Sequence, residues 1–486
     1  MKNDNAREEL ISYISEKGFV YGPSPEIYGG VSGFFDFGPL GKLLKNNIEN
    51  TIRKEFTKFQ FYEIECPIVM PKAVWEASGH LSGFSDPLVS CQKCKSIFRA
   101  DNLISEQSGD DVEGQDNKNL EKYFDGSKIK CPTCGEKISS KVSNHNLMLK
   151  TNVGIDTEMY NRPETATTSY LPFLNYLRFF RDKLPFGIFQ IGNAYRNEIS
   201  PRQHLLRGRE FTQAEAQLFL FEEQKKDFEK FSEVENLKIS MIKAHGKEIK
   251  ISLKEALEKN LLKNKAYAWA IGITYRLFKE FGFEDSVLRF KQHEKMAFYA
   301  DDAWDLEINL NSFGWTECCG VHDRTDYDLK VHSEKSGKKL VAAKENGEKG
   351  TPHIIEIAMG PNRILFSILD QCYNKKETDE GKTKLHLPKN MAPIKAAIFP
   401  LMKKEELQKV SNKIFEDLIS DFVVQLDESG SIGKRYLRQD SIGTPYCITV
   451  DYDSLKDGCV TVRDRDSEKQ ERVKMEDLKN WLGKNI

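Results

Sequence analysis

The segment 189–215, which reads FQIGNAYRNEISPRQHLLRGREFTQAE, constrains the fold and chemistry of this 486-residue chain more than any other. Both of its ends have the residue pattern of strands, and the loop between them is polar and contains a proline. Arg196 and Arg207 can hold phosphate or carboxylate oxygens with two parallel hydrogen bonds. Phe211 offers a flat face to a purine base. The segment therefore predicts a nucleotide site on antiparallel strands. An amphipathic hairpin with a solvated charged face is the alternative.

Composition places the chain among ordinary globular proteins. Its length suggests roughly two to four domains. The formal net charge of −2 excludes an overall basic field but not a local basic face for one RNA partner. The N-terminus MKNDNAREEL is polar, and no apolar run approaches the length of a membrane span. We therefore expect a soluble, cytoplasmic protein with no membrane partner.

Four of the ten cysteines form two Cys-x-x-Cys pairs, Cys91 with Cys94 and Cys131 with Cys134. Two such pairs can surround one zinc ion with four thiolates, and a closed four-cysteine site is structural. The separation of the pairs is longer than in the most compact zinc ribbons, so the polar segment between them is expected to loop out. A redox Cys-x-x-Cys and four unrelated free thiols are the rival interpretations.

The rest of the chain divides by its periodicity. Apolar residues recur every four positions from Leu40 to Phe56, which predicts a helix, and the strand-like run that follows contains Pro67. Residues 221–295 are charged and largely helical in pattern. Residues 373–388 are charged without apolar periodicity, which is typical of a linker. Beyond them strands and helices alternate, with helices expected near 404–418, 432–441 and 475–482, which predicts a compact mixed α/β domain.

These motifs resemble those of the class II aminoacyl-tRNA synthetases. Residues 195–211 are similar to motif 2 of the glycyl-tRNA synthetases, with Tyr195 where that family usually has phenylalanine. The helix and proline-containing strand resemble motif 1, which pairs two subunits, with core packing inside one subunit as the alternative. Gly360-Pro-Asn-Arg363 resembles motif 3. The residues beyond the linker resemble the family's C-terminal anticodon-binding domain. The resemblance covers almost the whole chain in the family's order.

The resemblance implies an α/β (α+β) fold: an antiparallel class II sheet flanked by helices, a zinc-binding insertion and a mixed α/β anticodon-binding domain. We expect the catalytic core at 1–86, 149–220 and 296–372, the zinc-binding insertion at 87–148 and a helical insertion at 221–295. A linker at 373–388 and the anticodon-binding domain at 389–486 complete the chain.

The resemblance also implies an activity. A homodimer would activate glycine with ATP and Mg²⁺, transfer glycine to the 3′ end of tRNA-Gly, and carry a structural Zn²⁺. One rival is a related synthetase that uses another small amino acid or acceptor. The other is a non-catalytic, synthetase-like binding subunit. The chain lacks the HIGH and KMSKS signatures, a GxGxxG fingerprint and a Walker A loop, so other nucleotide folds have no support.

The family's functional residues map onto this chain one by one. The resemblance implies catalytic roles for Arg196, Glu198 and Arg363. ATP contacts are expected from Arg196, Asn197, Glu198, Leu206, Arg207, Arg209, Glu210, Phe211, Glu317, Cys318, Gly360 and Arg363. Glycine contacts are expected from Arg99, Glu164, Phe211, Gln213, Glu215, Glu356, Ala358 and Gly360. Lys434, Arg435, Tyr436 and Arg438 form a basic-aromatic cluster that could contact tRNA, with a solvated helix face as the alternative.

The chain departs from the family at three positions near the expected glycine site. Thr167, Ala214 and Ala358 stand where the family usually has glutamine, methionine and serine. These changes predict a more apolar or slightly roomier pocket, or one that has repacked around Met359. Elsewhere, we expect the run from Asp323 to Asp328 to form ion pairs on the surface.

Overall fold

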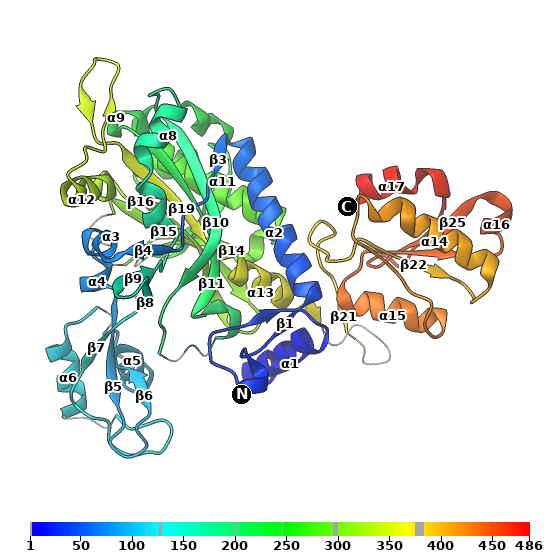
Figure 1. The fold of residues 1–486 in the computed structure, drawn as a ribbon, viewed down its shortest axis with the longest axis horizontal. Helices are drawn as coiled ribbons and strands as arrows, with labels where there is room; N and C mark the ends of the chain where they lie inside the picture. Colours follow the sequence, from blue (N-terminus) through cyan, green and yellow to red (C-terminus); the bar gives the residue numbers. More distant parts are fainter. Residues whose placement is uncertain are drawn as a thin grey trace.

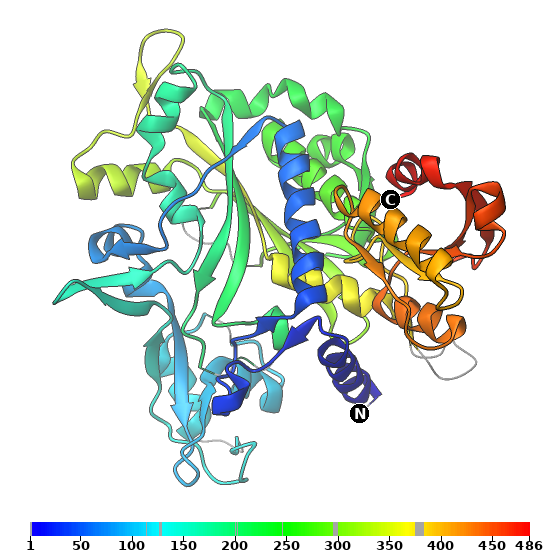
Figure 2. The same cartoon turned by 45° about the vertical axis from the view of Figure 1, so that its right-hand side comes forward.

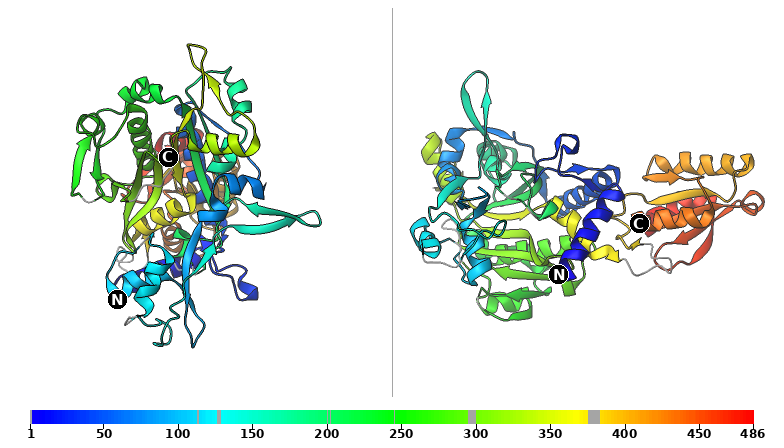
Figure 3. Two further views of the ribbon diagram at one scale, coloured as in Figure 1. Left: turned by 90° about the vertical axis from the view of Figure 1, so that its left-hand side faces the viewer. Right: turned by 90° about the horizontal axis from the view of Figure 1, so that it is seen from below.

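The structure is a computed structural model that describes residues 2–112, 114–125, 129–199, 201, 203–244, 246–294, 300–374 and 383–486. Figure 1 shows three parts: a large body around a twisted sheet, a smaller lobe that projects from it (residues 85–146), and a C-terminal domain at the opposite side. The views in Figure 3 place the C-terminal domain at one end of the long axis. Among the described residues, no helix is both long and apolar enough to cross a membrane.

A nine-stranded sheet forms the frame of the large body. Its order is β13 (Glu248–Ser252), β12 (Lys238–Ile242), β14 (Leu288–Gln292), β15 (Asp302–Leu310), β16 (Gly314–Asp323), β19 (His353–Met359), β11 (Glu210–Leu220), β10 (Phe186–Tyr195) and β3 (Phe61–Glu63). Neighbours are antiparallel except β12 with β14 and β10 with β3. The largely antiparallel core sheet expected from the sequence is confirmed.

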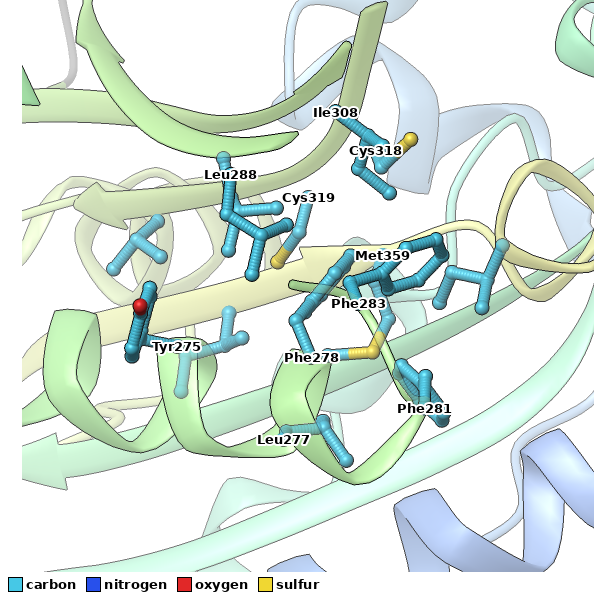
Figure 4. Packing of buried hydrophobic residues seen from close by; sticks show 14 of the residues in the cluster. Tyr275, Leu277, Phe278, Phe281, Phe283, Leu288, Ile308, Cys318, Cys319 and Met359 are labelled. Atoms are coloured by element: carbon cyan, nitrogen blue, oxygen red, sulfur yellow. The ribbon is translucent and has the colours of Figure 1, made fainter. Parts of the chain in front are cut away.

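Three helices cover one face of this sheet: α2 (Pro39–Lys58), α11 (Lys265–Glu280) and α13 (Pro361–Cys372). Figure 2 shows α2 lying along the body beside the central strands. The side chains that β11, β16 and β19 turn toward these helices are buried and apolar. Figure 4 shows Met359 beside Phe278 and Phe283, and Cys319 near Leu288, in this layer. The opposite face of the same strands is thereby left for polar residues.

The segment 221–295 contains the helices α9 (Glu222–Lys226), α10 (Leu253–Glu258) and α11, as its pattern predicts. It also contributes the strands β12, β13 and β14 to the nine-stranded sheet, which the sequence did not predict, and its main helix α11 lies in the central core. In β12 the buried Ile239 and Met241 alternate with more exposed residues. A strand with one solvated face carries many charged residues. In a segment that is charged throughout, the alternation of apolar and polar residues is therefore hard to recognise.

The proline-containing run after α2 is split into two strands. β3 joins the edge of the large sheet, whereas β4 (Val69–Pro71) pairs with β9 (Thr157–Asn161) in a separate sheet with β8 (Leu149–Val153). Pro67 lies between β3 and β4, outside both ladders, where its missing N–H costs no strand pairing. The short helices α3 (Lys72–Ala77) and α4 (His80–Gly83) then lead into the projecting lobe.

The projecting lobe has its own small core. Its sheet contains β5 (Ser85–Ser90), β6 (Ile97–Arg99) and β7 (Ser143–Asn146), with helices α5 (Ala100–Ser108) and α6 (Asn117–Asp125). Leu103, Ile104 and Leu120 are buried between these elements. This cluster makes the lobe a separate packing unit.

The C-terminal domain is a five-stranded mixed sheet with the order β23 (Val424–Leu426), β22 (Ala396–Pro400), β24 (Tyr446–Val450), β25 (Cys459–Asp464) and β26 (Gln470–Lys474). Its helices are α14 (Glu405–Ile419), α15 (Ile432–Ile442), the short α16 (Ser454–Asp457) and α17 (Leu478–Asn485). The predicted mixed α/β domain and its three main helices are confirmed. Tyr13 OH donates to the carbonyl of Ser441, which ties α1 (Lys2–Glu16) to this domain.

The predicted linker is partly structured. β20 (Tyr373–Asn374) pairs with β21 (Lys384–Leu385), and Leu385 and Leu387 are buried in the central core. Residues 375–382 lie outside the described residues. The smaller elements are β1 (Val20–Tyr21), β2 (Asp36–Phe37), α7 (Ala166–Tyr170), α8 (Phe173–Phe179), α9 (Glu222–Lys226), α10 (Leu253–Glu258), α12 (Tyr327–Ser336), β17 (Ala342–Ala343) and β18 (Lys349–Gly350).

Candidate active site

A cavity of about 320 Å³ opens on the polar face of the nine-stranded sheet. The strand register explains which residues reach it, because Glu215, Ala358, Gly320 and Asp305 lie side by side across four neighbouring strands. The cavity brings together fourteen of the residues predicted from the sequence: Glu164, Arg196, Glu198, Leu206, Arg207, Phe211, Gln213, Glu215, Glu317, Cys318, Glu356, Ala358, Gly360 and Arg363.

A β-bulge in β16 aims Glu317 into this cavity. In the ladder between β15 and β16, Cys319 lies opposite Leu306, and Glu317 lies opposite Glu307, so Cys318 is the extra residue. Without this extra residue, the alternation of side chains along β16 would turn Glu317 away from the cavity, to the other face of the sheet from Gly320. With it, the Glu317 carboxylate lies 3.3 Å from Nη1 of Arg363 and its side chain is 54% exposed in the open cavity.

Three arginines line the end of the cavity formed by β10, β11 and α13. Nε of Arg196 donates to the carbonyl of Pro163, and its guanidinium lies 5.4 Å from the ring centroids of both Phe84 and Phe211. Arg207 forms an ion pair with Glu198 (2.8 Å). These contacts hold planar donors beside an aromatic ring, an arrangement suited to a nucleotide.

The third arginine, Arg363, is held at the first turn of α13. Its Nε donates to the carbonyl of Leu206 and its Nη1 to the carbonyl of Glu317. Pro361 occupies the first position of the helix, and Gly360 precedes it. The backbone carbonyls thereby orient the guanidinium toward the cavity that Arg196 and Arg207 also line.

Three carboxylates converge at the other end of the cavity: the buried Glu215 and Glu356 and the partly buried Glu164. Thr165 Oγ1 donates to Glu215 (2.5 Å), and Thr167 Oγ1 donates to Glu164 (2.6 Å). Tyr170 OH and Gln217 both donate to Glu356, at 3.0 and 3.1 Å. These hydrogen bonds hold the carboxylates in place although burial of such groups is costly.

The electrostatic states of the three carboxylates differ. Burial, together with the charges of Glu356 and Glu164, raises the pKa of Glu215 to about 8. Burial also opposes the charge on Glu356, but Arg324 and His322 outweigh it and lower its pKa to about 2. His80 and Arg324 likewise hold the pKa of Glu164 below its ordinary value against the effect of burial. The cluster is therefore anionic near neutral pH but keeps one proton on Glu215.

Arg324 is not on the surface, as the sequence predicts, but beneath these carboxylates. Its guanidinium bonds Asp328 through two nitrogens (2.8 and 2.9 Å) and Glu356 through Nη1 (3.3 Å). Asp323 is also buried and pairs with Lys225 at 2.5 Å. Charged residues are rarely buried unless paired, so the run of charges alone favours the wrong location.

Four of the predicted contacts do not line the cavity. Arg209 donates to the carbonyls of Ser32, Glu198 and Ile199 and so braces the loop of the arginine hairpin. Asn197 donates from its backbone N–H to the carbonyl of Leu147, and Glu210 accepts from Asn193 and Tyr195. Arg99 pairs with Asp101 and Asp86 and lines a neighbouring cavity that also contains Glu198 and Arg207.

The three departures from the family pattern have different surroundings. Ala214 is buried on the opposite face of β11, toward the helices, so it does not enlarge the cavity. Met359 also lies in that apolar layer. Thr167 supplies a hydroxyl to Glu164, so this substitution keeps a polar contact. Only Ala358 presents an apolar methyl group directly to the cavity, as the sequence predicts.

Several cavity residues were not predicted from the sequence, notably His293, Asp305, His322 and Arg324. Gly320, His322 and Arg324 are spaced by two, and this period continues the polar face of β16. That alternation is the signal that could have found His322 and Arg324. For His293, which follows the end of β14, the local sequence carries no comparable signal.

The four cysteines of the projecting lobe come together. Sγ of Cys91 lies 3.5 Å from Sγ of Cys134, and Sγ of Cys94 lies 3.6 Å from Sγ of Cys131. A tetrahedral Zn²⁺ with bonds of about 2.3 Å would separate its sulfurs by about 3.8 Å. Hydrogen bonds with the side chain and backbone of Ser96 lower the pKa of Cys94 to about 6. The four thiols are a possible metal site and are not disulfide-bonded.

The basic-aromatic cluster on α15 is only partly exposed. Arg435 is buried and donates to the carbonyls of Pro400, Glu428 and Gly430, so the structure does not present it to an RNA. Tyr436 packs against Phe399 and hydrogen-bonds Thr449. Arg438 pairs with Asp427 on the surface, and Lys434 is exposed. These two side chains are the ones that a ligand on this face could reach.

Comparison with known proteins adds to this geometry. The model of the tRNA synthetase class II core domain (G, H, P, S and T) matches residues 150–372, and that of an anticodon binding domain matches residues 395–485. The glycine–tRNA ligase of Pyrococcus furiosus is 38% identical, with 98% of both chains covered. That of Methanocaldococcus jannaschii is 37% identical, with 99% of both chains covered.

Solved structures show the same fold at lower identity. A prolyl-tRNA synthetase from Cryptosporidium parvum, complexed with halofuginone and AMPPNP, has a TM-score of 0.59 and 16% identity, and the match covers 98% of this chain and 76% of that one. A prolyl-tRNA synthetase from Giardia lamblia in complex with prolyl-adenylate has a TM-score of 0.59 and 15% identity, with 98% and 76% covered. These two likenesses concern the fold alone.

Proposed function

Because the chain belongs to the glycine–tRNA ligase family of class II aminoacyl-tRNA synthetases, we propose that it activates glycine with ATP and transfers the glycyl group to the 3′ end of tRNA-Gly. One observation carries the proposal: a single cavity is lined by Arg196, Arg207 and Arg363 at one end and by three carboxylates, two buried and one partly buried, at the other. ATP is an anion and an amino acid carries an ammonium group, so the two ends match the two substrates of the first step.

In the first step a carboxylate oxygen of glycine bonds to the α-phosphorus of ATP, and the bond from this phosphorus to the pyrophosphate breaks. Two anions approach each other, so the step needs fixed cations and alignment more than a base. We assign Arg196 to the α-phosphate and the glycine carboxylate, and Arg207 to the distal phosphates. Phe211 and Arg363 would hold the adenine between them. Glu198 keeps the Arg207 guanidinium in place through their ion pair.

Magnesium neutralises charge on the phosphates when it is bound. Glu317 could hold this ion, because its carboxylate is half exposed in the cavity and lies beside Arg363. In the second step a hydroxyl of the terminal ribose of tRNA attacks the carbonyl carbon of glycyl-adenylate. The bond from this carbon to the phosphate oxygen of AMP breaks, AMP leaves, and the proton of the hydroxyl is released to solvent.

The carboxylates Glu164, Glu215 and Glu356 would hold the glycine ammonium. Since Glu215 retains a proton in the free protein near neutral pH, an arriving ammonium would displace that proton and pair with the resulting charge. The guanidinium of Arg324, which is hydrogen-bonded to Glu356, keeps the Glu356 carboxylate ionised. Larger amino acids would be excluded by shape, because a glycine pocket has no side chain to recognise.

Ala358 motivates a second candidate function. Its methyl group lines the cavity, so the site has an apolar patch where a small side chain could be accommodated. A related synthetase that prefers alanine or serine would keep the ATP half of the site unchanged. Comparison of amino acids in the exchange assay below separates the two candidates.

We also propose a structural Zn²⁺ in the projecting lobe. The four sulfurs are already spaced close to the edges of a zinc tetrahedron. The residues that follow the two pairs, Lys95 and Gly135, have positive φ angles of 60° and 74°. These turns fold each pair back so that both of its thiols face the same point.

We further propose a cytoplasmic homodimer that binds tRNA-Gly through its C-terminal domain. β3 is an edge strand of the large sheet, and its Tyr62 is 52% exposed beside Phe179, which is 65% exposed. Exposed aromatic side chains beside an unpaired strand edge favour a protein interface. On the C-terminal domain, Lys434 and Arg438 are the cations of α15 that could contact tRNA phosphates.

The test of the proposed function is ATP–pyrophosphate exchange with glycine, alanine and serine, followed by charging of tRNA-Gly with labelled glycine. We expect glycine to support the fastest exchange and Arg196→Ala to lose it. Lys226→Ala is the matched control, because it removes one exposed cation of α9 outside the cavity. Equal exchange by the parent and Arg196→Ala would refute the role of Arg196. Faster exchange with alanine or serine would refute glycine as the substrate.

A further inference from the structure

Three side chains in the wall of the cavity are assigned no substrate contact in the proposed reaction: His293, Asp305 and His322. His293 directly follows β14, Asp305 lies on β15 and His322 on β16. These strands are neighbours in the sheet, so residues far apart in the sequence meet at one place. All three side chains are partly buried and face the cavity.

The geometry of these side chains is that of a metal-ligand set. One ligand atom from each residue lies within 4.8 Å of the other two. Nε2 of His293 is 2.7 Å from Oδ2 of Asp305. Within the described part of the chain, this buried nitrogen nevertheless has no well-directed hydrogen-bond partner. The two imidazole rings are nearly perpendicular, at 83°, with centroids 5.7 Å apart.

The surroundings orient His322 as a ligand. Its Nδ1 lies 3.0 Å from Oε1 of Glu356, which leaves Nε2 for another partner. A histidine that binds a metal through one nitrogen usually contacts a carboxylate or carbonyl through the other, which sets its tautomer and orientation. Glu356 is itself held by Tyr170 and Gln217, so this support is rigid.

Gly320 keeps the space between the ligands open. A Cβ atom at this position would lie 2.6 Å from Cε1 and 3.0 Å from Nε2 of His322, and 3.3 Å from Oδ1 of Asp305. Any larger residue would therefore push His322 and Asp305 away from the point on which their ligand atoms converge. Glycine at this strand position keeps that point accessible from the cavity.

We propose that His293, Asp305 and His322 bind one divalent transition-metal ion of the zinc type, separate from the four-cysteine site. Two imidazoles and one carboxylate suit Zn²⁺ or Co²⁺, whereas Mg²⁺ prefers oxygen ligands alone. Three protein ligands leave the fourth tetrahedral position open to the cavity, as in zinc sites that bind small molecules. The rival arrangement is a His–Asp pair that holds β14 to β15 without an ion.

The test is a titration of the full-length, metal-free protein with Co²⁺, followed by its absorption spectrum. We expect two equivalents to bind. The four-cysteine site gives a thiolate-to-cobalt charge-transfer band, and the site of His293, Asp305 and His322 gives only d–d bands. In His322→Ala and in His293→Ala, one equivalent and its d–d bands should be lost while the charge-transfer band remains. That band also reports that each variant is folded around its cysteines.

His386→Ala is the matched control, because His386 lies 2.7 Å from Asp466 in a His–Asp pair of the C-terminal part of the chain. It should still bind two equivalents. Glu356→Gln should weaken the second equivalent about 10- to 100-fold, since it removes the carboxylate that orients His322. An excess of Mg²⁺ should not displace Co²⁺ from this site.

A parent protein that binds only the equivalent with the charge-transfer band would overturn the proposal. Unchanged stoichiometry in both histidine variants would overturn it as well, because the second ion would then lie elsewhere. Neither result depends on catalysis, so failure here leaves the proposed glycine activation untouched.

Discussion

Removal of Arg324 should destabilise the catalytic core strongly. Its guanidinium is bonded to Asp328 and Glu356, and the side chains of all three residues are 7% exposed or less. Arg324→Ala leaves two buried carboxylates without their cation. Breaking a buried ion pair by removing one partner costs about 3–5 kcal/mol, because the remaining charge stays buried and unpaired. We expect a loss of this size in the free energy of unfolding.

This loss should be visible in thermal unfolding. In a unit of roughly 150–250 residues, 1 kcal/mol shifts Tm by about 2–4 °C, so the core transition should fall by at least about 6 °C. Differential scanning calorimetry separates it from the transition of the C-terminal domain, which has its own core. The control is Lys335→Ala, which breaks a 2.8 Å ion pair with Glu76 between half-exposed side chains. An exposed pair contributes about 0–1 kcal/mol.

The same reasoning predicts a rescue. When Glu356→Gln and Asp328→Asn are added to Arg324→Ala, no buried charge remains unpaired, and Tm should recover part of the loss. An Arg324→Ala variant whose core transition lies within about 1 °C of the parent would refute the reasoning. So would a triple variant that is less stable than the single one.

Three other perturbations test separate parts of the structure. Glu215→Gln should flatten the dependence of stability on pH. In the parent, the pKa of Glu215 is about 8 in the folded state and 4.5 in the unfolded state, so only the folded state keeps the proton between these values. The free energy of unfolding of the parent therefore falls as pH rises through this range. Equal slopes of Tm against pH in parent and variant would contradict this. Chelation of the metal, or Cys94→Ser, should make residues 87–148 sensitive to protease while the C-terminal domain stays resistant. Limited proteolysis with mass spectrometry measures this. A lobe that stays as resistant as before would show that no metal stabilises it. Gly192→Ala places a Cβ 2.3 Å from Nη2 of Arg162, which is buried and held by the carbonyls of Asn193 and Cys66. It should therefore cost about 1–3 kcal/mol in urea unfolding. Gly433→Ala on α15 meets no atom within 4 Å apart from its chain neighbours and its own helix backbone, and it should be neutral or slightly stabilising.

The arginine hairpin shows how far local pattern reaches. β10 and β11 lie where the alternation in residues 189–215 predicts strands, and the period of two sets the side of β11 from which Phe211 and Glu215 project. The same rule shows that Ala214 points into the apolar layer, away from the cavity. Resemblance to the family therefore identified Ala214 as a departure, but the effect of Ala214 on the pocket depends on the direction of its side chain.

The charged segments show where local pattern fails. The run from Asp323 to Asp328 is predicted to form ion pairs on the surface, and residues 221–295 are predicted to be a largely helical insertion. Arg324 and Asp323 are buried nonetheless, because Glu356 and Lys225 come from distant parts of the chain to neutralise them. No feature within a few residues of Arg324 encodes the presence of Glu356.

The sequence by itself determined the class of fold and the order of the domains through its resemblance to a known family, and it identified the arginines of the cavity and the two cysteine pairs. These depend on the periodicity of short segments and on motifs whose residues are close neighbours in the chain. The tertiary structure alone decided that the bulge at Cys318 aims Glu317, that Arg324 lies beneath the carboxylates, and that His293 meets Asp305 and His322. The physical reason is that strand register and burial are set by pairing between distant segments, which fixes the face and the charge of each side chain.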